Sequence, residues 1–215
     1  MNLSTFTQKS AHTIAEKLDL QETQGRILAY GLEVALSFLC GAAAVFIIAM
    51  LLGVLYPTFI VVVVATFFRS FTGGAHCTSS LRCNVVSAVV FPLLGLLAAK
   101  LTLWFGAPGN LLILSGLLFT LLLTYLYAPG RVPQKPISEK QQKKLRARTM
   151  LLIPFWIVLL FYGSNRTSAP LWVWPIFLGG VWQFSTLHPL VAKIFSYIDV
   201  FLQQAETSVS GRRCN

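Results

Sequence analysis

The chain has 215 residues, of which 55% are hydrophobic and only 11% are charged, and its net charge is +10. A soluble domain carries about 25% charged residues to solvate its surface, so this composition excludes an ordinary soluble domain and predicts a single membrane-embedded domain over residues 1–215. The basic residues lie between apolar segments and do not alternate with stacking aromatics in a polar module, so we expect membrane lipid and no nucleic acid as a partner.

The N-terminal segment 1–31 interleaves apolar residues such as Leu3, Phe6 and Ile14 with charged ones. This pattern is typical of amphipathic helices that lie in the membrane interface, and a helix docked on the cytoplasmic side is an equally open alternative. The segment lacks an apolar core followed by a small-residue cleavage site, so we expect no secretory signal peptide.

Apolar runs then alternate with short polar connections along the rest of the chain. The hydrocarbon core of a bilayer is about 30 Å thick and needs about 20 apolar residues of helix to cross it. We predict an all-α integral membrane protein with about six transmembrane helices, near residues 34–52, 55–68, 85–103, 111–127, 150–162 and 171–190.

The distribution of basic residues predicts the orientation. In a six-span arrangement, 15 of the 17 Lys and Arg residues fall on one side of the membrane, and only Lys100 and Arg166 fall on the other. Because cytoplasmic connections are enriched in Lys and Arg, we expect both termini and the connection 69–83 to be cytoplasmic.

The connection 69–83 has a composition unlike the rest of the chain. It places two glycines, one histidine, two cysteines and two arginines between two apolar spans. His76 and Cys83 are seven residues apart, and on a straight helix their Cα atoms would be about 10.5 Å apart. A nucleophile and its base must lie within hydrogen-bond reach. A catalytic pair therefore requires a broken or re-entrant segment, with the break expected near residues 78–80, whose hydroxyls compete for backbone hydrogen bonds.

Several readings of this connection are open. Arg69 and Arg82 would favour a thiolate, or would hold an oxyanion or a substrate carboxylate. Cys77, next to the histidine, is the second-choice nucleophile, and a solvated histidine with space-filling cysteines is the non-catalytic alternative. A metal site would use His76, Cys77 and Cys83, but neither Cys-x-x-Cys nor His-x-x-x-His is present, so we expect no metal and no cofactor.

Two motifs resemble a known family. The run Arg69-x3-Gly73-Gly74-x-His76-x6-Cys83 closely resembles the signature of accessory gene regulator B (AgrB) proteins, membrane cysteine endopeptidases that process quorum-sensing propeptides. The stretch 128–148, which begins Ala-Pro-Gly-Arg-Val-Pro-Gln-Lys-Pro-Ile and continues as a basic run, resembles the central cytoplasmic loop of that family. Chain length and number of spans also match, so the resemblance covers nearly the whole chain.

The resemblance assigns roles to particular residues. It implies that Cys83 is the nucleophile and His76 its base, with Arg69, Gly73 and Gly74 in support. It implies that a basic group binds the acidic tail of the substrate, namely Lys135, Lys140, Lys143, Lys144, Arg146 and Arg148. This chain departs from the family pattern directly after the histidine, where a small inert residue is usual.

The resemblance also implies a substrate and a setting. It predicts a bacterial inner-membrane enzyme, acting as a homodimer on a short amphipathic propeptide with an internal cysteine and an acidic tail, and releasing a thiolactone. A group that orients His76 stays open among Asp199, Glu139, Asn84 and Gln183. The competing classes are a small transporter or lipid-handling protein, which would be expected to carry ionisable groups inside its spans, and a membrane scaffold.

Overall fold

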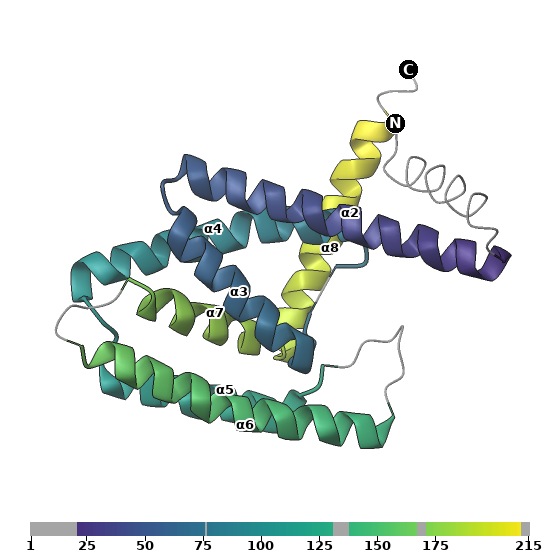
Figure 1. Cartoon of the computed structure of the whole chain (residues 1–215). Coiled ribbons are helices and arrows are strands. Elements are labelled where there is room, and N and C mark those ends of the chain that lie inside the picture. The colour runs from purple at the N-terminus through teal and green to yellow at the C-terminus, as the bar shows by residue number, and fades with distance from the viewer. Residues whose placement is uncertain (1–20, 76, 131–137, 167–170, 212–215) are drawn as a thin grey trace.

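The structure is a computed structural model that describes residues 21–75, 77–130, 138–166 and 171–211, and within these residues its regular structure is entirely helical (Figure 1). Five of its helices are long and apolar enough to cross a membrane. They are α2 (Glu22–Leu51), α3 (Leu55–Thr72), α4 (Ser80–Phe105), α5 (Asn110–Tyr127) and α6 (Glu139–Ser164). The predicted all-α membrane class is therefore confirmed.

The helices stack as three pairs, α2 with α4, α3 with α7 (Val173–Ser185), and α5 with α6 (Figure 1). Aromatic side chains join the middle pair to α6. The ring of Phe68 on α3 lies 5.0 Å from that of Phe184 on α7 and 5.8 Å from that of Trp156 on α6. All three side chains are buried, so this cluster holds the end of α3 that leads into the connection 69–83.

The sixth predicted span, 171–190, is a shorter helix than expected. α7 has 13 residues, which is about 20 Å at 1.5 Å per residue. It nevertheless leads from the end of the bundle where α6 finishes back toward the end where α6 begins (Figure 1). Small residues let it pack closely on its neighbours. A Cβ atom on Gly179 would lie 2.9 Å from the Val61 carbonyl oxygen, and one on Gly180 would overlap the Trp156 ring. α7 is thus the inner helix of the bundle.

Three helices extend beyond the predicted spans. α2 begins at Glu22, after a capping box formed by Gln21 and Gln24, so residues 22–31 extend the first span, while residues 1–20 of the predicted amphipathic segment lie outside the described residues. α3 continues beyond residue 68 to Thr72. α6 begins at Glu139, because Ser138 accepts a hydrogen bond from the Gln141 amide and caps it. The second half of the predicted basic loop 128–148 is therefore helical.

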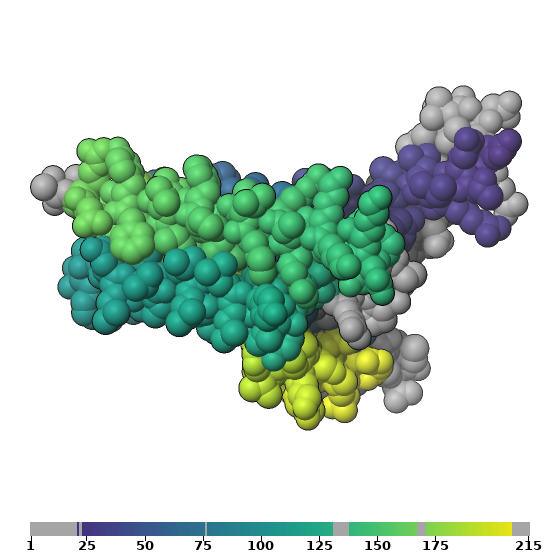
Figure 2. All heavy atoms as spheres, turned by 90° about the horizontal axis from the view of Figure 1, so that it is seen from below, coloured from purple at the N-terminus to yellow at the C-terminus, as the bar shows by residue number. Residues whose placement is uncertain are grey.

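The last helix, α8 (Pro189–Gly211), runs across the others (Figure 1). Figure 2 shows α5 and α6 side by side along one face of the molecule, with α8 next to the end of α5. One side of α8 is buried through Phe195 and Asp199, while Ile194, Tyr197 and Phe201 are exposed. This amphipathic pattern is typical of a helix that lies along a membrane surface.

Candidate functional site

The connection between α3 and α4 is a sharp break in the helical structure. α3 ends at Thr72 and is capped by Gly73, which has φ 68° and ψ −141°, and Gly74 has φ 137°. These backbone conformations are unfavourable for residues with a Cβ atom. α4 begins only at Ser80, so the predicted break is present. His76 lies outside the described residues, so its pairing with Cys83 stays a prediction.

A buried amide on α7 holds the glycine turn. The Gln183 side chain, 1% exposed, donates through Nε2 to the Thr72 hydroxyl at 3.1 Å and to the Gly73 carbonyl oxygen at 2.7 Å. The Ala75 amide donates to the Thr186 carbonyl oxygen at 3.0 Å. Gln183 was one candidate for orienting the histidine; its Nε2 donor contacts Thr72 and Gly73, and its relation to His76 stays a prediction because that residue lies outside the described residues.

Arg69 closes the same turn from its other side. It lies in the last turn of α3, and its Nη2 atom donates to the Ala75 carbonyl oxygen at 3.0 Å. The Gly73 amide in turn donates to the Arg69 carbonyl oxygen at 2.9 Å. The Gly73 and Ala75 amides are thus both hydrogen-bonded within the fold. Arg69 therefore shapes the turn.

The connection between α5 and α6 packs directly on the glycine turn. The Gly130 amide donates to the Thr72 carbonyl oxygen at 2.8 Å, and a Cβ atom on Gly130 would lie 3.0 Å from the Gly74 nitrogen. Arg146 on α6 donates through Nε to the Ala128 carbonyl oxygen at 2.9 Å. The predicted substrate-binding residue Arg146 thus supports this connection, a role that its place in a basic run did not indicate.

Of the other predicted basic residues, four lie on α6 and one lies outside the described residues. Lys140, Lys143, Lys144 and Arg148 are exposed on the first turns of α6, and Lys135 lies outside the described residues. A small groove of about 230 Å³ separates this part of α6 from Pro129. The structure therefore brings four of the six predicted basic residues into one exposed group on α6.

The two cysteines of the connection lie together. Cys77 is 6% exposed, whereas Cys83, in the first turn of α4, is half-buried. Burial raises the pKa of the Cys77 thiol to about 11, the electrostatic effects of Cys83 and Asp199 and a hydrogen bond to Cys83 act in the same direction, and Arg82 opposes them. Cys77 is consequently a protonated thiol at neutral pH, in which state it is a poor nucleophile.

Both cysteines open onto a groove of about 460 Å³ between α2 and the start of α4. Tyr30, Val34 and Phe38 of α2 form an apolar wall. The remaining lining residues are Ser37 on α2, and Cys77, Thr78, Ser80, Cys83 and Asn84 along the start of α4. The groove thus offers an apolar and a polar side to an extended chain.

Asn84 joins the two sides of this groove. Its Nδ2 atom donates to the Ser37 carbonyl oxygen at 2.8 Å and lies 3.2 Å from the Ser37 hydroxyl. A Cβ atom on Gly41 would overlap the Asn84 amide, so a residue without a side chain lets α2 and α4 approach here. Asn84 was a second candidate for orienting the histidine, and in the structure its amide nitrogen fixes the groove.

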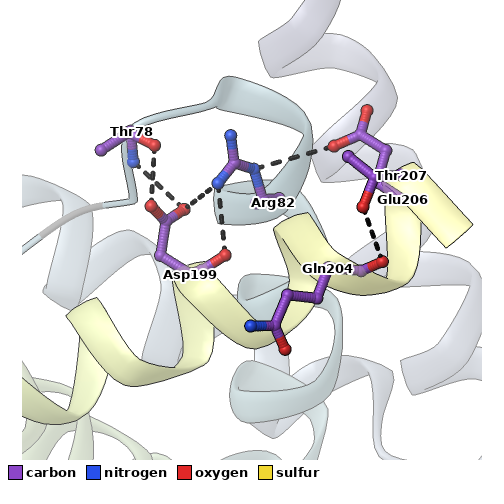
Figure 3. Close-up of polar contacts among 6 residues, drawn as sticks. All are labelled: Thr78, Arg82, Asp199, Gln204, Glu206 and Thr207. Carbon is purple, nitrogen blue, oxygen red and sulfur yellow. Dashed lines mark hydrogen bonds and ion pairs between the residues drawn. The ribbon is translucent and has the colours of Figure 1, made fainter.

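Arg82 is also engaged within the fold. Its Nη1 atom lies 3.0 Å from the Asp199 carboxylate on α8 (Figure 3). The sequence suggests Asp199 only as one of four candidates for orienting His76. Its pairing with Arg82 could not be predicted, because the two residues are 117 positions apart along the chain. No local pattern pairs the two residues.

Comparisons with known proteins identify a family and several relatives of this chain. The sequence model described as accessory gene regulator B matches residues 7–187. An AgrB-like protein of Clostridium perfringens strain SM101 is 23% identical over 209 residues, which is 93% of this chain and 97% of the relative. AgrB-like proteins of Listeria innocua and Listeria monocytogenes serotype 4a are 29% and 28% identical over 168 residues, 77% of each chain. No solved structure matches.

The close fit around Gly74 predicts that an added methyl group there is costly. A Cβ atom on Gly74 would overlap the Thr186 hydroxyl, whereas one on Gly53, which also has positive φ, would meet open space. We expect Gly74→Ala to destabilise the protein by about 2–4 kcal/mol, the sum of backbone strain and overpacking. Gly53→Ala should cost about 1 kcal/mol from strain alone. Thermal unfolding in detergent measures both.

A second change separates overlap from strain. Thr186→Ala removes the hydroxyl, so the double variant Gly74→Ala, Thr186→Ala should recover part of the lost stability. Equal losses for Gly74→Ala and Gly53→Ala would contradict the packing described for the turn.

The protonation of Cys77 predicts the order of thiol alkylation. At pH 7.5 we expect iodoacetamide to modify Cys83 at least about tenfold faster than Cys77, because the thiolate is the reacting form and Cys77 is buried. The Cys77 rate should climb by about tenfold for each pH unit and level off near pH 11. Peptide mass mapping of timed samples measures both rates, and preferential modification of Cys77 at pH 7.5 would contradict the assignment.

Proposed function

This chain belongs to the accessory gene regulator B family, which connects it to quorum sensing, and we propose that it is a membrane cysteine endopeptidase. In this proposal it cleaves the C-terminal tail from an autoinducing-peptide precursor and promotes thiolactone formation. The observation that carries the proposal is the position of Cys83, half-buried beside a protonated Cys77, at the polar side of a groove between α2 and α4.

The chemistry starts from the Cys83 thiolate. Its sulfur attacks the scissile carbonyl carbon, and protonated His76 gives a proton to the leaving amine, so that a thioester replaces the peptide bond and the tail is released. The thiol of a cysteine within the peptide then attacks the thioester carbonyl, the peptide–Cys83 bond breaks, and Cys83 recovers its thiolate while His76 regains the proton. Exchange of one thioester for another is close to thermoneutral, so no ATP is required.

Cys77 supports this assignment without acting as the nucleophile. As a protonated thiol it donates its hydrogen bond to the Cys83 sulfur and is itself a poor nucleophile. Cys77 lines the same groove but is 6% exposed, so it offers less of its surface to an incoming carbonyl group than the half-buried Cys83. The departure of this chain from the family pattern after the histidine is therefore compatible with Cys83 as the attacking group.

The groove suits an extended peptide of mixed polarity. The exposed side chains of Tyr30 and Phe38 offer apolar contacts on α2, while Ser80 and Asn84 offer hydrogen-bonding groups on the opposite side. A substrate with an amphipathic leader would lie along the membrane surface and enter this groove with its scissile bond over Cys83. Partial exclusion of water by the apolar wall would protect the thioester from hydrolysis.

The exposed basic group at the start of α6 is the proposed site for the acidic tail. It lies at the same end of the bundle as the connection between α3 and α4 (Figure 1). Clustered Lys and Arg at this end favour the cytoplasmic side of a bacterial inner membrane, with α7 as a sixth crossing. A homodimer stays a prediction from the family.

Substitution at three positions tests the chemistry. A candidate propeptide with an internal cysteine and an acidic tail is co-expressed with the protein, and its mass is followed. We expect Cys83→Ala and His76→Ala to abolish cleavage, a loss of at least about 10³-fold, because each removes a group that takes part in the bond-breaking step. Cys77→Ala should retain cleavage.

The outcomes separate the roles of the residues. Cleavage that survives both Cys83→Ala and His76→Ala would end the peptidase proposal. Loss of cleavage in Cys77→Ala alone would reassign the nucleophile. Membrane-fraction blots of each variant control for the amount of inserted protein.

The basic group is tested by removing its charge. The triple variant Lys140→Gln, Lys143→Gln, Lys144→Gln should raise KM by about tenfold with kcat little changed, since exposed ion pairs contribute up to about 1 kcal/mol each. The effect should shrink as salt is added. Lys100→Gln, an exposed lysine at the other end of α4, is the control, and a KM equal to wild type in the triple variant would refute the role of this group.

A further inference from the structure

A buried carboxylate on α8 holds the start of α4. Asp199 is 6% exposed, and both of its oxygens accept hydrogen bonds from Thr78 (Figure 3). The Thr78 amide donates to Oδ1 at 3.3 Å, and the Thr78 hydroxyl donates to Oδ2 at 2.7 Å. Thr78 directly precedes Ser79, the N-cap of α4, so a side chain from a distant helix satisfies a backbone donor that α4 itself cannot use.

Arg82 completes the arrangement. Its Nη1 atom lies 3.0 Å from Asp199 Oδ1 and donates to the Asp199 carbonyl oxygen at 3.2 Å. A positive charge in the first turn of a helix is unfavourable to the helix dipole, and the carboxylate beside it offsets this. A buried carboxylate is itself costly unless it is paired and hydrogen-bonded. We call Thr78, Arg82 and Asp199 the α8 clamp.

The α8 clamp holds the residues that are adjacent in sequence to the two cysteines. Thr78 follows Cys77, and Arg82 precedes Cys83. Between these two fixed residues the chain passes from extended backbone into the first turn of α4. Asp199 therefore fixes the position of the Cys83 backbone, although Asp199 does not line the groove.

We infer that Asp199 is a positioning residue, which holds Cys83 in register with the groove by clamping the start of α4 to α8. This inference rests on the proposed peptidase function. α8 lies beyond residue 187, where the match to the family model ends, so that model does not cover Asp199. The clamp adds the last described helix to the site.

The clamp acts on the bond-making step. A nucleophile must lie at about 3–3.5 Å from the reacting carbon, and a displacement of about 1 Å can cost on the order of 10²-fold in rate. Because Asp199 does not contact the groove, loss of the clamp should lower kcat and leave KM within about twofold.

Three substitutions test the clamp against a matched control. Asp199→Asn removes the charge that pairs with Arg82 and replaces one of the two acceptor oxygens by a donor, and Thr78→Val removes the hydroxyl, so each should lower kcat by at least about tenfold. Thr78→Ser keeps the hydroxyl and should stay near wild type. Glu206→Gln is the control, because Glu206 is an exposed acid on the same helix, 3.9 Å from Arg82 Nε, and should change kcat by less than about twofold.

Alkylation of Cys77 tests the clamp without a substrate. Release of Thr78 should expose the neighbouring thiol, so iodoacetamide should modify Cys77 at least about fivefold faster in Asp199→Asn and Thr78→Val than in Glu206→Gln. Monodisperse elution in detergent selects folded protein for these measurements.

The two readouts fail separately. Wild-type kcat and a wild-type Cys77 rate in Asp199→Asn would overturn the clamp, and so would a lowered kcat that Thr78→Val does not reproduce. If the wild type cleaves no propeptide, the peptidase proposal fails, and the alkylation rates alone decide whether Asp199 holds the start of α4.

Discussion

The pair of hydrogen bonds from the Gln183 amide to Thr72 and Gly73 is the interaction on which the arrangement of the site depends. The chain must reverse between α3 and α4 without leaving buried backbone groups unpaired, since each unpaired group costs free energy comparable to a lost hydrogen bond. Gln183 reaches the turn only because small residues bring α7 close to α3. Helix packing in the bundle interior thereby determines the shape of the connection that carries the cysteines.

Around this turn, residues divide by what they contact rather than by chemical type. Arg69 and Arg146 are both cations, yet each donates to a backbone carbonyl oxygen in a connection between helices. The lysines at the start of α6, by contrast, are exposed. A guanidinium offers several donors in a fixed geometry, which suits it to holding irregular backbone. Charge alone therefore does not identify a substrate-binding residue in this protein.

The fold was largely predictable from the sequence because length and apolarity decide what a bilayer accepts, and the break before α4 followed from the spacing of His76 and Cys83. The start of α6 was not, because a run of Lys, Gln and Arg is equally compatible with a loop and with a solvated helix, and only the Ser138 cap decides between them. The roles of Gln183, Arg146 and Asp199 depend on contacts between distant helices, which local patterns do not contain.

The short length of α7 and its buried glutamine have a consequence for how the protein inserts into the membrane. A segment of 13 residues with a buried glutamine offers the insertion machinery little free energy on its own, and its small residues have no purpose until α3 and α6 flank it. We therefore expect α7 to insert only after α3 and α6 are in the bilayer, by packing against them. Assembly of the bundle and formation of the turn would then be a single event, because Gln183 contacts Thr72 and Gly73 only when α7 is packed against α3.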